Sequence, residues 1–225
     1  MKHPLQTRAS GVTLVEIAIV LVIIGLLLGG VLKGQELIDS ARIKSGVNDL
    51  NSVAVAYHAY VDRFHSLAGD DAGPLGTLAS LQSRGGNWAS VSEFGNNDGV
   101  LAVTQAQVFT AGGEAAAFWQ ALKAGGFIAG NPGDAGVAAL PRNAFNGFIG
   151  VGPGVTSAAG VTALSVCLSQ VPGKAARAID IQLDDGLADR GNVLATQATV
   201  GANTAPGAAA SSYSDDNQYT LCRSL

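Results

Sequence analysis

Charged side chains are scarce in this chain of 225 residues, at 13% of the total with a formal net charge of −4. No basic stripe interleaved with aromatic residues is present, which argues against nucleic acid as the main ligand. The chain also lacks a nucleophile elbow, a phosphate-binding loop and a metalloprotease motif, so no enzymatic activity is indicated. Hydrophobic residues nevertheless reach 48%, a composition typical of a folded chain.

Proline is missing over a long stretch, from residue 5 to residue 73. Nothing there forces a break in a helix. Apolar residues recur at spacings of four and three, which is the pattern of one helix face. They are Ile43, Val47, Leu50, Ala54, Tyr57, Val61 and Phe64. We expect one helix from about Val12 to about Leu67, with this stripe packed on the chain's own domain rather than in a coiled coil with another chain.

An unbroken apolar run occupies the N-terminal part of that helix. Between Val12 and Leu32 the only charged residue is Glu16. The run is roughly 30 Å long as a helix, which matches a bilayer core. Lys2 and Arg8 precede it, which predicts a cytoplasmic N-terminus and export of the remainder. The alternative is a cleaved secretory signal peptide, but the run is longer than such a segment and no convincing cleavage site follows it.

Glu16 is an unfavourable residue at this position. A carboxylate at the centre of a bilayer costs about 2.5–3.5 kcal/mol, and such residues usually have a partner. The alternative is a side chain that extends to the membrane edge and keeps its charge in water.

The segment "GVTLVEIAIVLVIIG" resembles the N-terminal signature of type IV pilins and of the pseudopilins of type II secretion. Glycine, apolar run and glutamate have the family's spacing, whereas Val12 departs from its usual phenylalanine. The resemblance covers about the first 65 residues. It implies that a prepilin peptidase cuts between Gly11 and Val12 and methylates the new N-terminus. It also implies that Glu16 of one subunit pairs with the Val12 amine of a neighbour, which lowers the cost of both charges.

The rest of the chain is expected to fold as a globular domain of short elements. Helices are expected within residues 113–127 and 172–186, and strands within 144–152, 163–171, 192–200 and 218–225. Residues 80–99 and 199–218 are expected to be long loops, and Trp88 and Phe94 should pin the first of them to the core. We expect an antiparallel sheet laid on the C-terminal half of the long helix. This α+β plan is also the one that the resemblance implies.

Two side-chain groups in the domain are candidates for special roles. Export would place Cys167 and Cys222 in an oxidising compartment, and many pilins close a C-terminal loop with one disulfide; the alternative is two buried free thiols. Acidic residues crowd the end of the helix expected at 172–186, where the helix dipole disfavours them. They are Asp180, Asp184, Asp185 and Asp189. Some pseudopilins hold calcium near their C-terminus, but the spacing does not match a calcium loop, and Arg177 or Arg190 could compensate equally well. No other cofactor is expected.

Three segments are therefore predicted: a leader (1–11), a long helix (12–67, with 12–32 as membrane span and filament core) and a globular domain (68–225). The predicted function is a structural subunit of a type IV pilus-like filament, not an enzyme. The alternatives are a pseudopilin of type II secretion and a monomeric membrane-anchored periplasmic binding or enzymatic domain.

The resemblance also implies partners and a location. The partners are copies of the chain or related pilins, the prepilin peptidase, an inner-membrane assembly platform and the membrane. The subunit would begin as a single-pass inner-membrane protein and end in an extracellular pilus or a periplasmic pseudopilus.

Overall fold

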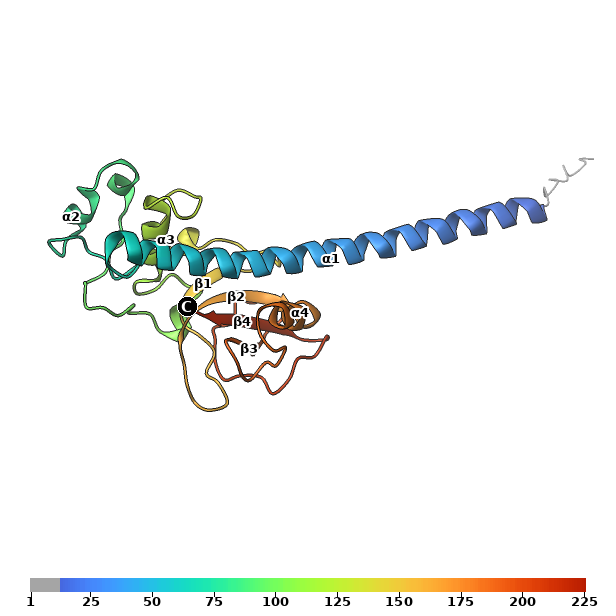
Figure 1. Ribbon diagram of the computed structural model, residues 1–225. Coiled ribbons are helices and arrows are strands. Elements are labelled where there is room, and N and C mark those ends of the chain that lie inside the picture. Colours follow the sequence, from blue (N-terminus) through green and yellow to red (C-terminus); the bar gives the residue numbers. More distant parts are fainter. Residues whose placement is uncertain (1–12) are drawn as a thin grey trace, which may run out of the picture. The chain divides into compact units, whose positions relative to one another are not determined.

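The computed structural model describes residues 13–225, which fall into two units. The first unit ends at Ala41, and the second comprises Arg42–Leu225. One helix, α1 (Leu14–Phe64), continues through the boundary (Figure 1).

Up to Leu32, the sides of α1 in the first unit are apolar apart from Glu16. Its large aliphatic side chains are between 46% (Ile24) and 91% (Leu14) exposed. Helix α1 is the one helix of the described residues that is long and apolar enough to span a membrane. An apolar helix exposed on every side requires lipid or other protein around it.

The second unit is built on a four-stranded antiparallel sheet with the strand order β1-β2-β4-β3. The strands are β1 (Ile149–Pro153), β2 (Leu164–Pro172), β3 (Val193–Ala198) and β4 (Gln218–Ser224). Helix α4 (Gly173–Leu183) follows β2 directly. The expected α+β fold class is confirmed.

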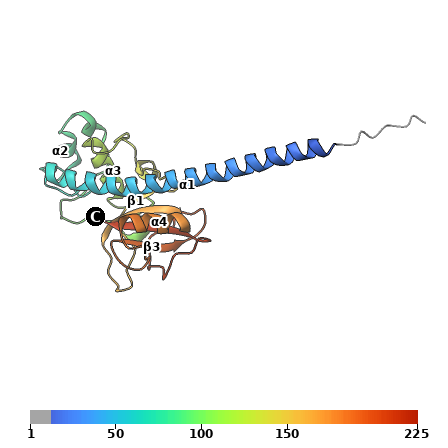
Figure 2. The same cartoon turned by 45° about the vertical axis from the view of Figure 1, so that its right-hand side comes forward.

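Between α1 and β1 lie short helices joined by long loops (Figure 2). They are α2 (Leu78–Gln82), α3 (Ala115–Ala124) and three 3₁₀ turns, at Gly86–Ser90, Gln105–Gln107 and Gly136–Ala139. All ten residues of α3 are buried. Two of them are polar. Gln120 accepts the N–H groups of Ser92 and Glu93, both at 2.9 Å, and Lys123 donates to the Ala139 carbonyl at 3.0 Å. The polar residues of α3 therefore hold the loops on either side of it.

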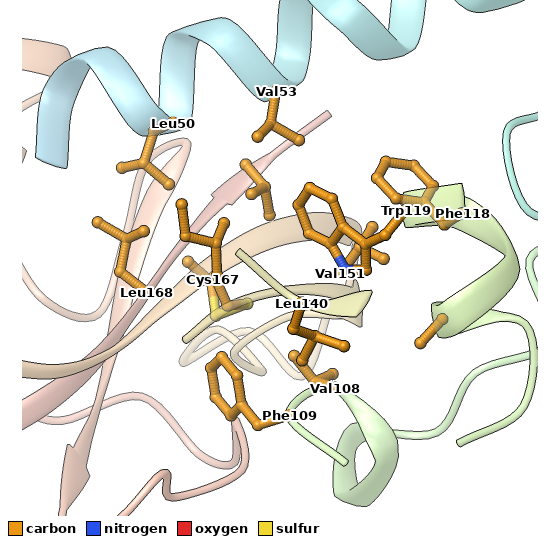
Figure 3. Packing of buried hydrophobic residues seen from close by; sticks show 14 of the residues in the cluster. Leu50, Val53, Val108, Phe109, Phe118, Trp119, Leu140, Val151, Cys167 and Leu168 are labelled. Atoms are coloured by element: carbon orange, nitrogen blue, oxygen red, sulfur yellow. A yellow bond between two sulfur atoms is a disulfide. The ribbon is translucent and has the colours of Figure 1, made fainter. Parts of the chain in front are cut away.

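The C-terminal half of α1 packs on the chain's own domain, as expected. Its buried face consists of Gly46, Leu50, Val53, Ala56 and Tyr60, and Figure 3 shows Leu50 and Val53 directed toward Leu168, Val151 and Trp119. This face is displaced from the predicted stripe, because Ala54 and Val61 are only half-buried. The physical reason is Gly46: without a side chain it admits Ile179, Leu168 and Phe145, which turns the centre of the contact toward it.

Tyr60, near the end of α1, is tied to the loop that follows. Its hydroxyl donates to Asp71 at 2.6 Å, and Arg84 binds the same carboxylate through two nitrogens at 2.7 and 3.1 Å. The Arg84 guanidinium also lies 4.6 Å from the ring centre of Phe64 and 4.7 Å from that of Trp88. Burial and the Asp71 carboxylate raise the pKa of Tyr60. These contacts fix the loop to the end of the helix.

Trp88 pins the loop of residues 80–99 as predicted, since only 6% of it is exposed. The same prediction was wrong for Phe94, which is 41% exposed. The backbone holds the chain there instead: Ser92 and Glu93 donate to Gln120, and Gly95 donates to the carbonyl of Asp71. With the backbone anchored on both sides, the Phe94 side chain is not needed in the core.

The close contact at Gly46 leads to a prediction about stability. A Cβ at this position would lie 2.9 Å from Ile179 Cδ1 and 3.3 Å from the ring of Phe145. Gly46→Leu should therefore lower the free energy of unfolding by about 1–3 kcal/mol through overpacking. Gly46→Ala should be nearly neutral, because a gain of about 1 kcal/mol in helix propensity offsets a small shift of Ile179.

Denaturant unfolding of the full chain in detergent measures this effect. Asn48→Leu, on the exposed face of the same helix, is the matched control and should change stability by less than about 0.5 kcal/mol. Equal losses in Gly46→Leu and Asn48→Leu would contradict the packing argument.

Candidate assembly site

Glu16 folds back onto the first turn of α1. Its Oε2 accepts hydrogen bonds from the backbone N–H of Thr13 at 2.8 Å and from the Thr13 hydroxyl at 2.9 Å. In return, the N–H of Glu16 donates to Thr13 Oγ1 at 3.3 Å. This reciprocal pair is a capping box, which satisfies donors that the start of a helix otherwise leaves unpaired. The carboxylate thus lies at the N-terminal end of α1, where the helix dipole favours a negative charge.

The predicted cleavage site lies beside this box but outside the described residues. Val12 directly precedes Thr13, so an amine created on Val12 would be one residue from the N–H that Glu16 already accepts. The geometry of Gly11 and Val12 themselves is not part of the described chain. The described residues show the Glu16 carboxylate held at the N-terminal end of α1.

Thr13 is a residue of this site whose role the sequence interpretation missed. The pattern Thr-Leu-Val-Glu at residues 13–16 has the spacing of a capping box, and this signal was available. The interpretation gave Glu16 only an intermolecular partner or a position at the membrane edge. The structure adds an intramolecular partner on the same helix.

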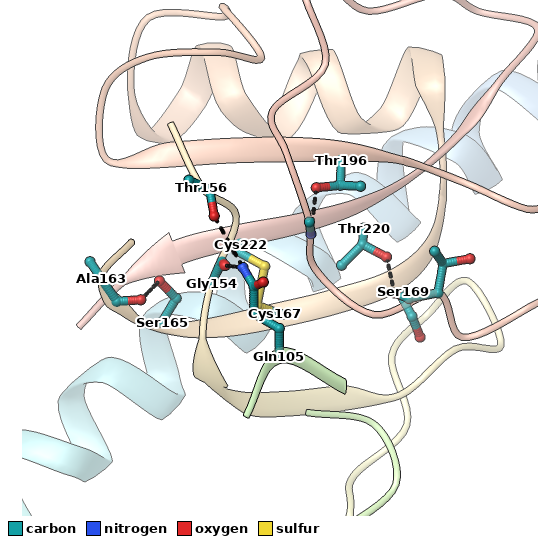
Figure 4. The surroundings of a disulfide bond; sticks show 12 residues. Gln105, Gly154, Thr156, Ala163, Ser165, Cys167, Ser169, Thr196, Thr220 and Cys222 are labelled. Carbon is teal, nitrogen blue, oxygen red and sulfur yellow. Dashed lines mark hydrogen bonds between the residues drawn. A yellow bond between two sulfur atoms is a disulfide. The ribbon is translucent and has the colours of Figure 1, made fainter. Parts of the chain in front are cut away.

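In the second unit, Cys167 and Cys222 are joined by a disulfide. They lie directly opposite each other on β2 and β4, the two central strands, and both are buried. Figure 4 shows the bond within the sheet, near the end of β1, where Gln105 donates to the carbonyl of Gly154 at 2.6 Å. The bond is the one that the resemblance implied, and it fixes the pairing of the last strand.

The acidic residues at the end of α4 separate into two groups. Carboxylate oxygens of Asp180, Asp184 and Asp185 lie within 4.8 Å of one another. Asp189 is not in this group and pairs with Arg190 at 3.0 Å.

Backbone and side-chain donors already bind the carboxylates of the group. Asp180 accepts the Tyr213 hydroxyl at 2.7 Å and the Gly186 N–H at 3.2 Å. Asp184 accepts the N–H groups of Asn192 and Val193, and Asp185 accepts that of Leu187. These bonds explain the cluster as a link between the end of α4 and the following chain.

Asp180 leads to a prediction of pH dependence. Burial raises the pKa of Asp180 to about 6, although the hydrogen bonds from Tyr213 and Gly186 oppose this shift. Since the folded state favours the protonated acid, this group stabilises the fold most below pH about 4, and the contribution is lost as the pH rises through about 6. The free energy of unfolding should fall by about 1–3 kcal/mol between pH 4 and pH 7 on this account.

Denaturant unfolding at several pH values measures the slope. Asp180→Asn should flatten it, whereas Asp215→Asn at an exposed site should not. Burial also raises the pKa values of Asp49 and Glu114, which both variants retain, so only the difference between the variants is diagnostic. An unchanged slope in Asp180→Asn would contradict the assignment.

The disulfide leads to a second stability prediction. It joins residues 55 positions apart, and in the chain-entropy treatment closing such a loop stabilises a fold by about 4 kcal/mol at most. Reduction should therefore lower the denaturation midpoint clearly, and Cys167→Ala/Cys222→Ala should behave like the reduced protein. The midpoint is measured with and without reductant; a midpoint that reductant leaves unchanged, with the bond shown to be open, would refute the prediction.

No family model, curated protein or solved structure matches this chain. A long apolar N-terminal helix, packed through its C-terminal half on an antiparallel sheet that contains a disulfide, is compatible with a pilin-like fold.

Proposed function

We propose that this protein is the structural subunit of a type IV pilus-like filament, cut between Gly11 and Val12 and assembled through its N-terminal helix. The observation that carries the proposal is Glu16, a carboxylate held at the N-terminal end of a helix whose apolar sides are all exposed. The resemblance of residues 11–25 to prepilins supports the same function.

The exposed sides of α1 favour one environment before assembly and another after it. In the membrane, lipid would cover residues 12–32, since a helix satisfies its own backbone hydrogen bonds there. In a filament, the same side chains would pack against those of other copies. Burying one Leu, Ile or Val side chain stabilises by about 1.5–3 kcal/mol relative to water. Release into water without other copies is therefore strongly disfavoured.

Glu16 can serve its own helix and a neighbour together. Oε2 carries both bonds from Thr13, and Oε1 has no partner among the described residues. A carboxylate has about four acceptor positions, so Oε1 remains available to the Val12 amine of another copy. That amine would lie level with Glu16 if the two helices were offset by four residues, about 6 Å. A contact between two different surfaces that repeats with a fixed offset produces an open filament.

In such a filament the second unit would form the outer surface. Loss of the leader removes Lys2 and Arg8 and changes the formal net charge of the chain from −4 to −6. A surface with this excess of acid does not favour capture of nucleic acid. A pseudopilin of type II secretion would use the same contacts in a shorter periplasmic filament, and neighbouring genes for a retraction motor or a secretion channel distinguish the two.

The capping box favours a second candidate, a monomeric membrane-anchored periplasmic domain. In that case Glu16 serves only the start of its own helix. Substitutions at Glu16 separate the two functions because glutamine and leucine differ in what they keep. Glutamine retains an oxygen that can accept the Thr13 N–H, but it has no negative charge to neutralise a protonated amine. Leucine retains neither property.

If the protein forms filaments, Glu16→Gln and Glu16→Leu should each reduce the yield of filaments sheared from cells at least about 10-fold. The reason is that an unpaired amine in an apolar core is costly. Thr13→Ser should assemble normally, because serine preserves the capping bonds. The measurement is filament recovery from cells that produce equal amounts of subunit in the membrane. Normal filaments from Glu16→Gln would favour a capping role alone, and a membrane protein that never sediments as filaments would favour the monomeric anchor.

Processing has its own test. The intact mass and N-terminal sequence of the protein from its native membrane should show a chain that begins at methylated Val12. A chain that still begins at Met1, in cells with an active prepilin peptidase, would leave Glu16 without an amine partner and would refute the filament function.

A further inference from the structure

Helix α4 carries its charges in an order that does not stabilise a helix. Lys174 and Arg177 lie in its N-terminal half, and Asp184 and Asp185 directly follow its last residue. The helix dipole favours acids at the N-terminal end and bases at the C-terminal end. The order of charges in α4 is the reverse of this. The backbone bonds to Asp184 and Asp185 account for the acids. Nothing within the helix accounts for the two bases.

Most basic side chains of the described residues have a partner in the chain. Lys33, Arg84, Lys123 and Arg190 form ion pairs, Arg63 and Arg142 lie over aromatic rings, and Arg223 binds Asn51. Across residues 13–225, no ion pair, hydrogen bond or ring contact involves the side chains of the remaining four. These are Arg42, Lys44, Lys174 and Arg177, and all four are exposed. Exposed bases without a partner in the chain remain available to an external anion.

Lys174, Arg177 and Ile181 share one exposed side of α4, which we call the α4 face. Ala175, Ala176 and Ile179 on the opposite side are buried, whereas Ile181 is 58% exposed. Exposed bases attract anionic lipid, and an exposed aliphatic side chain beside them can contact the acyl boundary. Helix α4 lies near the first residues of the second unit, because its buried Ile179 contacts Gly46 of α1 (Figures 1 and 2).

The chain limits the distance between the second unit and a membrane that holds the apolar run. Arg42 follows Leu32, the end of the apolar run, by ten residues. Ten residues extend about 15 Å as a helix and at most about 35 Å when fully extended. Basic residues are attracted to anionic lipid within about one Debye length, about 8–10 Å. The ten-residue span is an upper limit on the separation, and a tilted helix places the second unit closer to the surface.

We propose that the α4 face binds anionic phospholipid headgroups while the subunit is anchored in the membrane. The inference rests on the membrane insertion of the proposed function and does not depend on filament assembly. The contact would hold the second unit against the bilayer, and assembly would have to release it.

The test uses the full chain in nanodiscs made with and without phosphatidylglycerol in a phosphatidylcholine background. A fluorescent amino acid at position 178, a partly exposed site beside the α4 face, reports contact with lipids that carry a quencher on the headgroup. The same probe at position 200, which is 72% exposed in a loop, is the control. Quenching at position 178 should require the anionic lipid and should weaken as salt is added.

Lys174→Gln/Arg177→Gln should reduce the ratio of bound to free α4 face by about 30-fold, since each base near an anionic surface contributes roughly a factor of five. Arg63→Gln/Arg142→Gln removes the same charge elsewhere and should leave the quenching unchanged. Comparison of the two double variants separates a local contact from a net-charge effect.

Equal quenching with both lipids, or wild-type quenching in Lys174→Gln/Arg177→Gln, would overturn the inference. Quenching that follows the number of copies in each disc rather than lipid charge would assign the α4 face to a second copy and would also overturn it. A chain that enters the discs but shows no quenching at position 178 refutes this inference alone. A chain that fails to enter the discs refutes membrane insertion as well.

Discussion

The second unit depends on the packing of one helical face against the sheet. Gly46 allows α1 to lie close to Ile179 and Leu168, so the face contacts both α4 and β2. Further along, Leu50 and Tyr60 are fully buried, and the hydroxyl of Tyr60 binds Asp71, which in turn holds Arg84. The disulfide then joins β2 to β4. A displacement of this helical face would disturb the sheet, α4 and the loop after α1 together.

The same helix meets two different environments along its length. Up to Leu32 its apolar side chains face all directions, and from Arg42 onward only one face is buried. A change of pattern within an uninterrupted helix means that its two parts cannot be satisfied by the same solvent. The first part requires lipid or other helices, and the second requires a core on one side and water on the other. The charged residues between Lys33 and Lys44 mark the change.

Periodicity and composition were sufficient to predict the α+β class, the long helix and the strands of the sheet. They were not sufficient for the position of the buried face, because glycine contributes nothing to an apolar pattern and yet Gly46 makes the closest contact. Phe94 was misjudged for a related reason: an aromatic residue predicts burial, but hydrogen bonds from the backbone of Ser92 and Glu93 to Gln120 hold that loop. At the candidate site, Glu16 stands out as a lone charge in the sequence, whereas Thr13 is noticed only when the first turn of a helix is considered.

The double use of Glu16 has a physical advantage over either use alone. A side chain that only paired with a neighbour would be free to rotate before assembly, and fixing it would cost conformational entropy on association. The bonds from Thr13 fix the carboxylate beforehand at the end of the helix. A carboxylate that only capped its own helix would gain from the helix dipole but would still carry a net charge into an apolar environment. Thr13 positions the carboxylate and a neighbour's amine would neutralise it, so the two interactions solve different problems and do not compete.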